Sequence, residues 1–303
     1  PHQLFIEHPG LLQNPTKVIL IEDPLFFGSK RYVADFHKQK LWFHRATMMH
    51  FAEHLKSSGV SVDYIEHHQR PLKSLVSALI EQGCSKLIVA ELHDDLLERR
   101  LRSSCARVEL ELEVLSTPMF LNSQAQNTIY RQGKKRWFMA DFYKHQRRRL
   151  DILMEDGSPA GGQWSFDHQN RKKVPKRMLS SIPPIAFPEL GQVERDARAH
   201  VLEKYPNNPG CIDALIYPTN HASAADWLSK FLIERFELFG DYEDAIVKGE
   251  NFLWHSVLTP MLNVGLLTPQ QVVNAVLEYS SGNTIPLNAL EGFLRQVIGW
   301  REF

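Results

Sequence analysis

A stretch near the carboxyl end of the chain, LWHSVLTPMLNVG (253–265), places hydrogen-bonding side chains at the start of an apolar run. His255, Ser256 and Thr259 can all donate to an anion. The first backbone N–H groups of a helix that begins here would point the same way. This combination is typical of a phosphate-binding turn. The alternative is an ordinary helix start, in which Ser256 caps only its own helix.

A second group of residues lies at the end of the sequence. Gln296 and Trp300 are four residues apart, so a helix would place them on one face, and Arg301 follows directly. A cation and an amide beside an aromatic ring could contact a ligand. On the residues alone, core packing explains Trp300 better, and a solvated surface position is the alternative for Arg301.

Positive charge is concentrated in the middle of the chain. The 35 Lys and Arg residues balance 35 Asp and Glu overall, yet residues 131–177 hold 13 Lys and Arg against 5 Asp and Glu. A basic stretch in an otherwise acidic chain indicates a polyanion partner, and a solvated loop is the alternative.

The same stretch contains the sequence GGQWSFDHQNR (161–171). Gly161 and Gly162 allow close backbone approach, Trp164 can anchor the segment, and Asn170 with Arg171 could contact a phosphate. An ordered connector without a ligand explains the segment equally well.

The elements that would position these residues change type along the chain. The predicted strands are 17–22, 60–66, 86–91 and 108–115, and the predicted helices between them are 40–59, 71–83 and 94–104. Strands separated by helices imply a parallel sheet with right-handed crossovers. Ligands bind beyond the carboxyl ends of such strands, where Glu22 falls. A capping or surface carboxylate is the alternative for Glu22.

From about residue 116 this alternation stops. Residues 140–155 can form a basic amphipathic helix, and the segment that follows is predicted to be a long ordered loop, because a disordered linker would rarely carry Trp164 and Phe166. Only helical patterns remain after about residue 190. We therefore expect an α/β domain with a doubly wound parallel sheet at 1–120, a basic linker at 121–190 and a helical domain at 191–303.

Composition excludes several classes of protein. No run of about eighteen apolar residues is present, so no membrane span is expected, and no signal-peptide pattern is found. Cys84, Cys105 and Cys211 match no metal or disulfide spacing and suit a reducing cytosol. We expect a cytoplasmic protein with no metal site on this chain.

Three segments together resemble the photolyase/cryptochrome superfamily: GQWSFDHQNRKK (162–173), HSVLTPMLNVGLL (255–267) and LRQVIGWREF (294–303). The resemblance is closest to the bacterial iron–sulfur branch, the deoxyribodipyrimidine photolyase-related proteins, which include prokaryotic (6-4) photolyases. Asn263 and an additional Gly299 are features that this branch tolerates and other photolyases lack. The chain resembles the N-terminal portion of such a protein, with the α/β domain first and an incomplete helical FAD-binding domain after it.

The resemblance implies that the hydroxyl-rich turn binds the phosphates of FAD, with Arg301 as the cation. The implied flavin residues are His255, Ser256, Leu258, Thr259, Asn263, Gln296, Trp300 and Arg301. It also implies an antenna chromophore of the ribityllumazine type near Gln3, Glu22 and Lys40. UV-damaged DNA is the implied partner. Its expected contacts are Arg147, Arg148, Arg149, Asn170, Arg171, Lys172 and Lys173.

The implied activity is electron transfer from light-excited reduced FAD to a UV pyrimidine photoproduct, with the (6-4) type favoured. The iron–sulfur cysteines and the catalytic histidine pair of the branch are expected beyond Phe303, so no catalytic residue is assigned and the chain by itself is expected to be inactive. An apolar face along Leu290, Phe293, Leu294 and Val297 is expected to be exposed. Two alternatives remain open: a cryptochrome-like photoreceptor, and a nucleotide- and nucleic-acid-binding protein without photochemistry.

Overall fold

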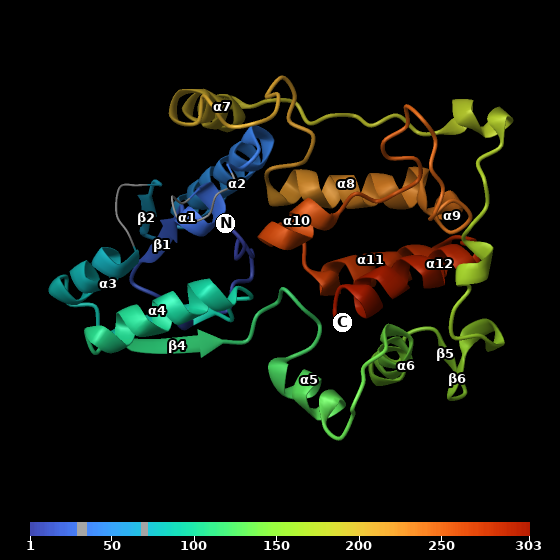
Figure 1. Cartoon of the computed structure of the whole chain (residues 1–303), viewed down its shortest axis with the longest axis horizontal. Coiled ribbons are helices and arrows are strands. Elements are labelled where there is room, and N and C mark those ends of the chain that lie inside the picture. The colour runs from blue at the N-terminus through green and yellow to red at the C-terminus, as the bar shows by residue number, and fades with distance from the viewer. Residues whose placement is uncertain (29–34, 68–71) are drawn as a thin grey trace. The chain divides into compact units, whose positions relative to one another are not determined.

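The computed structural model describes residues 1–28, 35–67 and 72–303 and divides into two compact units (Figure 1). Unit 1 comprises Pro1–Thr117, Phe187–Ser223 and Asn263–Leu266. Unit 2 comprises Pro118–Ala186, Ala224–Leu262 and Leu267–Phe303. Each unit gathers segments that are distant in sequence, whereas the sequence predicts three successive segments.

Unit 1 is an α/β structure whose strands are parallel in pairs. β1 (Val18–Ile21) pairs with β2 (Val62–Ile65), and β3 (Lys86–Ala90) pairs with β4 (Glu111–Leu115). The helices that alternate with them are α1 (Pro24–Phe27), α2 (Lys38–Ser57), α3 (Leu72–Glu81) and α4 (Asp95–Arg107). The predicted alternation is confirmed, except that Pro71, the predicted start of one helix, lies outside the described residues.

Among the described residues, the four strands form two separate two-stranded sheets and not the single doubly wound sheet that we expected. A cavity of about 580 Å³ in unit 1 is lined by both pairs. Val18–Ile21 contributes to its wall from one pair and Lys86–Val89 from the other, together with Val76 of α3 and Leu101 of α4. β1 and β3 therefore face this space, and no backbone hydrogen bond joins them in the described chain.

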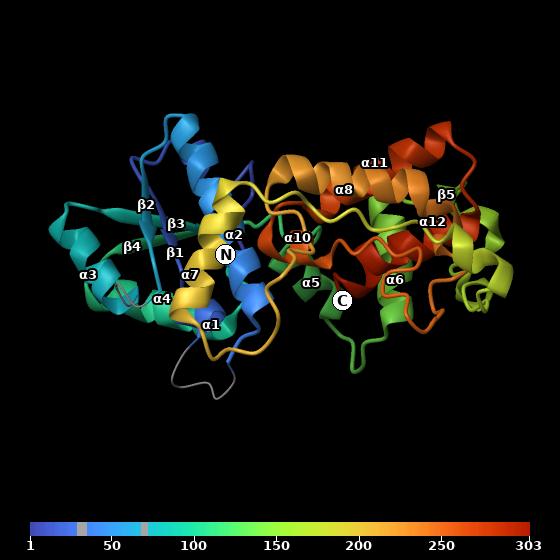
Figure 2. The ribbon, with the colours of Figure 1, turned by 90° about the horizontal axis from the view of Figure 1, so that it is seen from above.

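α7 (Gln192–Lys204) belongs to unit 1 because it packs against α2 (Figure 2). The buried indole of Trp42 donates to the carbonyl oxygen of Glu194 at 2.8 Å. The imidazole of His50 lies 2.7 Å from the carboxylate of the same Glu194. These contacts join residues about 150 positions apart, so the sequence predicts the helix but not its partner.

Unit 2 is mostly helical. It contains α5 (Gln124–Arg131), α6 (Met139–Leu150), the short hairpin of β5 (Met154–Glu155) and β6 (Ser158–Pro159), most of α8 (His221–Glu234), α9 (Phe236–Phe239), most of α10 (Thr259–Val264), α11 (Pro269–Gly282) and α12 (Leu287–Leu294). A π-helical turn, Arg295–Trp300, continues α12. The predicted helix at 140–155 ends early, at Leu150, because Asp151 has a left-handed backbone (φ 53°) and the hairpin follows. No described helix is both long and apolar enough to cross a membrane.

The core of unit 2 buries the apolar face that the sequence predicts to be exposed. Phe293 lies 4.9 Å from Phe231 and 5.4 Å from Phe239, measured between ring centroids. Leu294 and Val297 are also buried. The prediction of an exposed face is therefore wrong, because phenylalanines from α8 and α9 cover Phe293, and α6 packs against the π turn that carries Val297.

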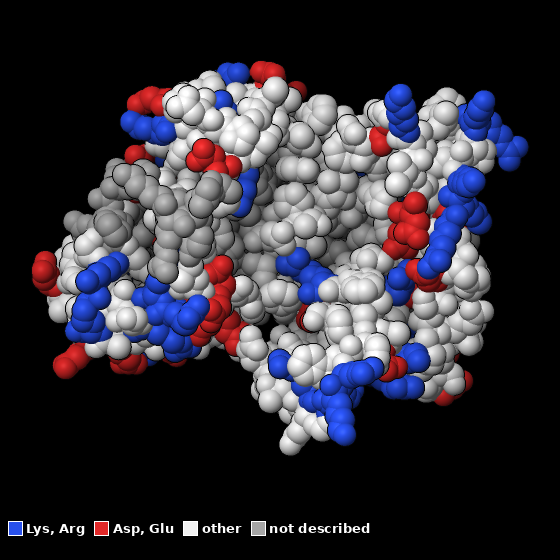
Figure 3. Space-filling view, in the orientation of Figure 1, with Lys and Arg blue, Asp and Glu red and all other residues white. Residues whose placement is uncertain are grey.

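Charge on the surface is uneven although the chain is neutral overall. Figure 3 shows Lys and Arg side chains gathered around α5 and the segment that connects it to α6. This segment lies within the basic stretch predicted to meet a polyanion.

Candidate functional site

Arg301 connects two of the segments that the sequence predicts to bind flavin. Its guanidinium donates to the carbonyl oxygen of Leu262 on α10 at 3.3 Å and lies 5.4 Å from the centre of the Phe120 ring. Burial lowers the pKa of Arg301, yet an arginine remains charged at neutral pH. The structure therefore holds a half-buried cation next to α10.

The turn before α10 presents two hydroxyl groups. In the described chain, neither the Ser256 nor the Thr259 hydroxyl makes a hydrogen bond, so the alternative that Ser256 caps its own helix does not hold. The turn itself is fixed by its backbone, because the carbonyl oxygen of Ser256 accepts from the indole of Trp227 at 2.8 Å. Both hydroxyls are thus available to an acceptor such as a phosphate.

The other predicted flavin residues in this segment have different surroundings. His255 packs its ring edge-on to Phe239 at 5.8 Å, and burial lowers its pKa, so it is neutral at pH 7. Leu258 is buried, whereas Asn263 is exposed. The His255 ring therefore packs partly against the protein interior, and Leu258 belongs to the core.

The π-helical turn determines how Gln296, Trp300 and Arg301 are arranged. The N–H of Arg301 donates to the carbonyl oxygen of Gln296 at 3.0 Å, a span of five residues, so the turn holds one residue more than an α-helix would. Gly299 sits where the turn meets α6, and a Cβ there would lie 3.2 Å from the ring of Tyr143. Gln296 is half-buried while Trp300 is exposed, so core packing does not explain Trp300.

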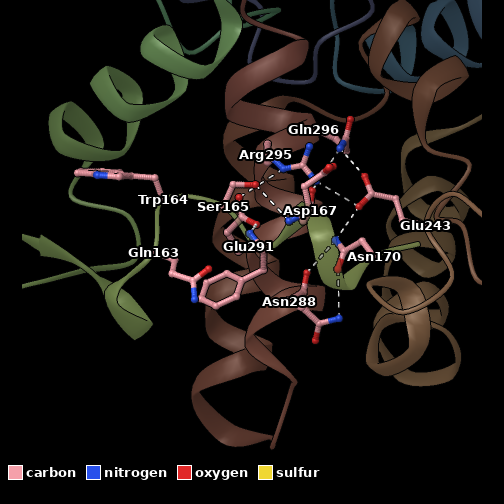
Figure 4. Close-up of polar contacts among 12 residues, drawn as sticks. Gln163, Trp164, Ser165, Asp167, Asn170, Glu243, Asn288, Glu291, Arg295 and Gln296 are labelled. Carbon is pink, nitrogen blue, oxygen red and sulfur yellow. Dashed lines mark hydrogen bonds and ion pairs between the residues drawn. The ribbon is translucent and has the colours of Figure 1, made fainter. Parts of the chain in front are cut away.

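Glu243 is the centre of a polar network that the sequence did not reveal (Figure 4). Its carboxylate accepts hydrogen bonds from the amides of Gln296 and Asn170, the latter at 2.8 Å, and lies 3.4 Å from Arg295. Burial raises the pKa of Glu243 in spite of these partners. The network joins a predicted flavin residue, Gln296, to a predicted DNA residue, Asn170.

The GGQWSFDHQNR segment is anchored to α12 and the π turn. The N–H of Phe166 donates to the buried carboxylate of Glu291 at 2.9 Å, and Arg295 lies 3.2 Å from Asp167 (Figure 4). Gly161 has a φ of 68°, and a Cβ there would lie 2.5 Å from a methyl group of Leu287. Close backbone approach is therefore confirmed at Gly161 but not at Gly162, where a Cβ would meet nothing within 4 Å. These contacts make the segment an ordered connector within unit 2.

Two of the predicted DNA contacts are not accessible. Arg147 is fully buried, and its guanidinium donates to the carbonyl oxygens of Ile152, Leu153, Gln163 and Trp164. Asn170 is buried in the Glu243 network. These two predictions are corrected: both side chains hold the connector in place and cannot reach a DNA phosphate.

The remaining predicted DNA contacts differ in their exposure and in whether an acidic side chain neutralises their charge. Arg171 and Lys172 are exposed but paired, Arg171 with Asp167 and Lys172 with Asp241 at 2.8 Å. Arg149 is half-buried and bonds the side chains of Gln146 and Asn122. Lys173 is exposed, and Arg148 is exposed above the Trp164 ring at 4.4 Å. Arg148 and Lys173 are the best placed of this set.

The predicted antenna residues lie in unit 1, where Glu22 is already occupied. Its carboxylate accepts from Arg45 at 2.6 Å, from the Tyr64 hydroxyl at 2.7 Å and from the backbone N–H of His67 at 2.9 Å. The amide of Gln3 donates to the carbonyl oxygen of Ala90 at 2.9 Å. Both side chains are thus used by the protein itself, and Glu22 organises a buried network.

Unused hydrogen-bonding capacity lies close by, around Phe26. Both ring nitrogens of His2 and the Nδ1 of His44 are buried and have no hydrogen-bond partner in the described structure. Burial lowers the pKa of His2 to about 3 and holds that of His44 well below its usual value, so both rings are neutral. Burial also lowers the pKa of Lys40, whose charge contributes to the shift at His44. His44 lies inside a predicted helix, where nothing in the sequence distinguished it from a core residue.

Comparison with known proteins assigns the chain to a family. Residues 1–217 match the model of the family described as deoxyribodipyrimidine photo-lyase-related protein. Because this match covers well over half of the sequence, the chain belongs to that family, which confirms the resemblance stated above. A relative from Agrobacterium fabrum (strain C58 / ATCC 33970), named (6-4) photolyase, is 28% identical over 272 residues. That alignment covers 88% of this chain and 53% of the relative.

Solved structures agree with this assignment at the level of the fold. A bacterial class III photolyase from Agrobacterium tumefaciens matches with a TM-score of 0.55 and 16% identity, covering all of this chain and 56% of that one. The cryptochrome of Synechocystis sp. PCC6803 matches with a TM-score of 0.59 and 12% identity, covering all of this chain and 59% of that one. The chain thus has a photolyase-type fold and spans little more than half the length of these relatives.

Proposed function

We propose that this protein is a light-driven DNA repair flavoprotein that reverses UV pyrimidine photoproducts, with the (6-4) type favoured. The observation that carries the proposal is the family match, together with the alignment of 88% of the chain to a relative named (6-4) photolyase. Reduced FAD would supply the electron. The protein would bind the flavin, position the damaged base and exclude water.

The residues next to α10 fit the phosphates of FAD. The free hydroxyls of Ser256 and Thr259 can donate to phosphate oxygens, and the Arg301 guanidinium beside Leu262 supplies positive charge. Trp300 and Asn263 are exposed and remain proposed contacts for the rest of the cofactor or for the lesion. The hydrogen bond from the Gln296 amide to Glu243 would fix the direction in which Gln296 presents this amide to the flavin.

The rings around Phe26 offer a heterocyclic antenna unused hydrogen-bonding groups, which Glu22 does not. The unpartnered nitrogens of His2 and His44 can hydrogen-bond a heterocycle, and Lys40 lies close enough to affect the pKa of His44. A ribityllumazine is the chromophore that the resemblance implies. An iron–sulfur cluster remains an expectation that rests on the branch alone.

Repair of defined photoproducts by the full-length protein under blue light tests the proposal. We expect a (6-4) photoproduct to be reversed in the light and not in the dark. Arg301→Ala should lower the flavin retained on purification, whereas Arg177→Ala, an exposed arginine of the connector, should not. Purification without flavin, or unchanged flavin in Arg301→Ala, would contradict the cofactor site.

A blue-light photoreceptor is the second candidate. The similarity to the Synechocystis cryptochrome concerns the fold, and the fold is shared by both classes. A protein that binds flavin and responds to light, but repairs neither a (6-4) photoproduct nor a cyclobutane dimer, would favour this candidate.

A further inference from the structure

The loop Arg131–Phe138, with the sequence RQGKKRWF, connects the end of α5 to the start of α6, and all eight residues are exposed. It contains four cations and two adjacent aromatic rings, and no acidic residue. None of its residues is among the DNA contacts that the sequence predicted. We name it the RW loop.

The positive charge of the RW loop is not neutralised by the protein. Arg131, Lys134, Lys135 and Arg136 make no ion pair with any described acidic residue. In contrast, Arg171 and Lys172 of the connector are paired with aspartates, and Arg147 is buried. The basic region in Figure 3 around α5 therefore includes four cations that no described acidic residue neutralises. Such charge attracts polyanions.

The two aromatic rings are exposed on a defined turn. Trp137 is 47% exposed and Phe138 is 58% exposed, although large aromatic side chains usually bury most of their area. The Arg131 guanidinium lies 4.4 Å from the centre of the Trp137 ring, so a cation is held against the aromatic face.

The backbone on both sides of these rings is fixed. The N–H of Lys134 donates to the carbonyl oxygen of Arg131 at 3.1 Å. The carbonyl oxygen of Phe138 accepts from Asp141 and from Phe142 in the first turn of α6, at 3.1 and 3.0 Å. Because the rings are presented by ordered backbone, little conformational freedom would be lost on binding.

We infer that the RW loop is a second DNA contact, which binds phosphates with its four cations and stacks an unpaired base on Trp137 or Phe138. Uncompensated cations beside exposed aromatic rings are what single-stranded nucleic acid recognition requires. In an intact duplex the base faces are covered, so the partner is DNA in which a base is unstacked, as it is next to a lesion. The inference rests on the proposed function for the source of such DNA, but its chemistry does not depend on flavin.

Equilibrium binding of the full-length protein to fluorescent oligonucleotides separates the two parts of the loop. The probes are a single strand, an intact duplex and a duplex with a two-nucleotide bulge. Trp137→Ala with Phe138→Ala should weaken binding to the single strand and the bulge roughly 5- to 100-fold and leave the salt dependence unchanged. Replacing the four cations by Gln should flatten the salt dependence, by about 0.7 in slope for each lost phosphate contact on the single strand.

Matched variants control for general surface effects. Trp137→Phe keeps a stacking ring and should retain most of the affinity. Ile129→Ser removes an exposed apolar side chain on α5 and should not weaken binding to the single strand or the bulge as the aromatic double variant does. Lys176→Gln with Arg177→Gln removes two cations of the connector and should not flatten the salt dependence as the loop cation variant does. Unchanged affinity of Trp137→Ala with Phe138→Ala would overturn the inference. So would binding of the wild type to anionic lipid vesicles that is lost in that variant while DNA binding is kept.

Flavin content and photorepair, measured on the same proteins, keep this inference distinct from the proposed function. Loop variants should retain wild-type flavin absorption, because no predicted flavin residue lies in the loop. The purified protein could lack flavin and photorepair activity while its DNA binding still depends on Trp137. This result would overturn the proposed function and support the inference that the RW loop binds DNA.

Discussion

Arg147 was predicted to contact DNA at the surface, but its buried side chain stabilises unit 2. Arg147→Gln should destabilise unit 2 by about 3 kcal/mol or more, because four carbonyl oxygens lose the charged donor that the buried Arg147 side chain supplies. Urea unfolding measures this loss. Its neighbour Arg148 is exposed, so Arg148→Gln should change stability by less than about 0.5 kcal/mol. Equal stability of the two variants would contradict the contacts of Arg147.

His44 gives the structure a predictable response to acid. Burial, with the nearby positive charge of Lys40, holds the pKa of His44 below its usual value of 6.5. As pH falls below 6.5, the unfolded chain takes up this proton before the folded chain does, so stability decreases with decreasing pH. His44→Phe should weaken this decrease between pH 6.5 and 4.5, and His168→Gln, at an exposed histidine, should not. Unfolding midpoints across pH test the difference.

The sequence suggested candidate site residues by their type but did not reveal their surroundings. The hydroxyls of Ser256 and Thr259 could be chosen because a helix start and its donors are local features. The burial of Arg147 could not be foreseen, since its partners belong to a hairpin and a connector that fold back onto α6. The same holds for Asn170, whose partner Glu243 is 73 residues away.

At the scale of elements, the contact between α12 and the connector depends on a glycine. A Cβ at Gly292 would lie 2.5 Å from the Asn170 amide nitrogen, which is bonded to Glu243. Gly292→Ala should therefore cost about 1–3 kcal/mol by displacing Asn170. Gly282→Ala, at the end of α11 where a Cβ meets nothing within 4 Å, should be neutral or slightly stabilising. Thermal unfolding of both variants checks the prediction.

Local patterns sufficed for most elements but not for their assembly. Apart from the short α1, the strands and helices up to β4 were predicted because hydrophobic periodicity and turn glycines are local, and Gly59 and Gly83 end their helices with a φ of 81°. The pairing of α7 with α2, and the covering of α12 by α8 and α9, depend on packing between distant segments. The π turn was also missed, because one inserted residue leaves the pattern of apolar residues nearly unchanged.

At the scale of the whole molecule, we predict that residues 1–303 alone fold but hold much less than one FAD per chain. The chain spans about half the length of the relative named (6-4) photolyase. Two of its proposed flavin contacts, Thr259 and Trp300, are exposed. The isoalloxazine ring of a bound FAD would therefore keep much of its apolar area in water. Flavin released from the purified chain and quantified against protein tests this. One tightly bound flavin per monomer would contradict it.

The cavity between the two strand pairs has a consequence for the response of the protein to hydrostatic pressure. Empty volume that disappears on unfolding makes the unfolded state smaller, so pressure favours unfolding in proportion to it. The space of about 580 Å³ lies wholly among residues of unit 1 and is partly open to solvent, so its enclosed part is what contributes to this effect. Unit 1 should therefore unfold at lower pressure than unit 2, and Ile88→Phe, which adds bulk to the wall formed by β3, should move its midpoint upward. High-pressure NMR follows the unfolding of each unit separately. Identical unfolding midpoints for the two units would contradict this prediction.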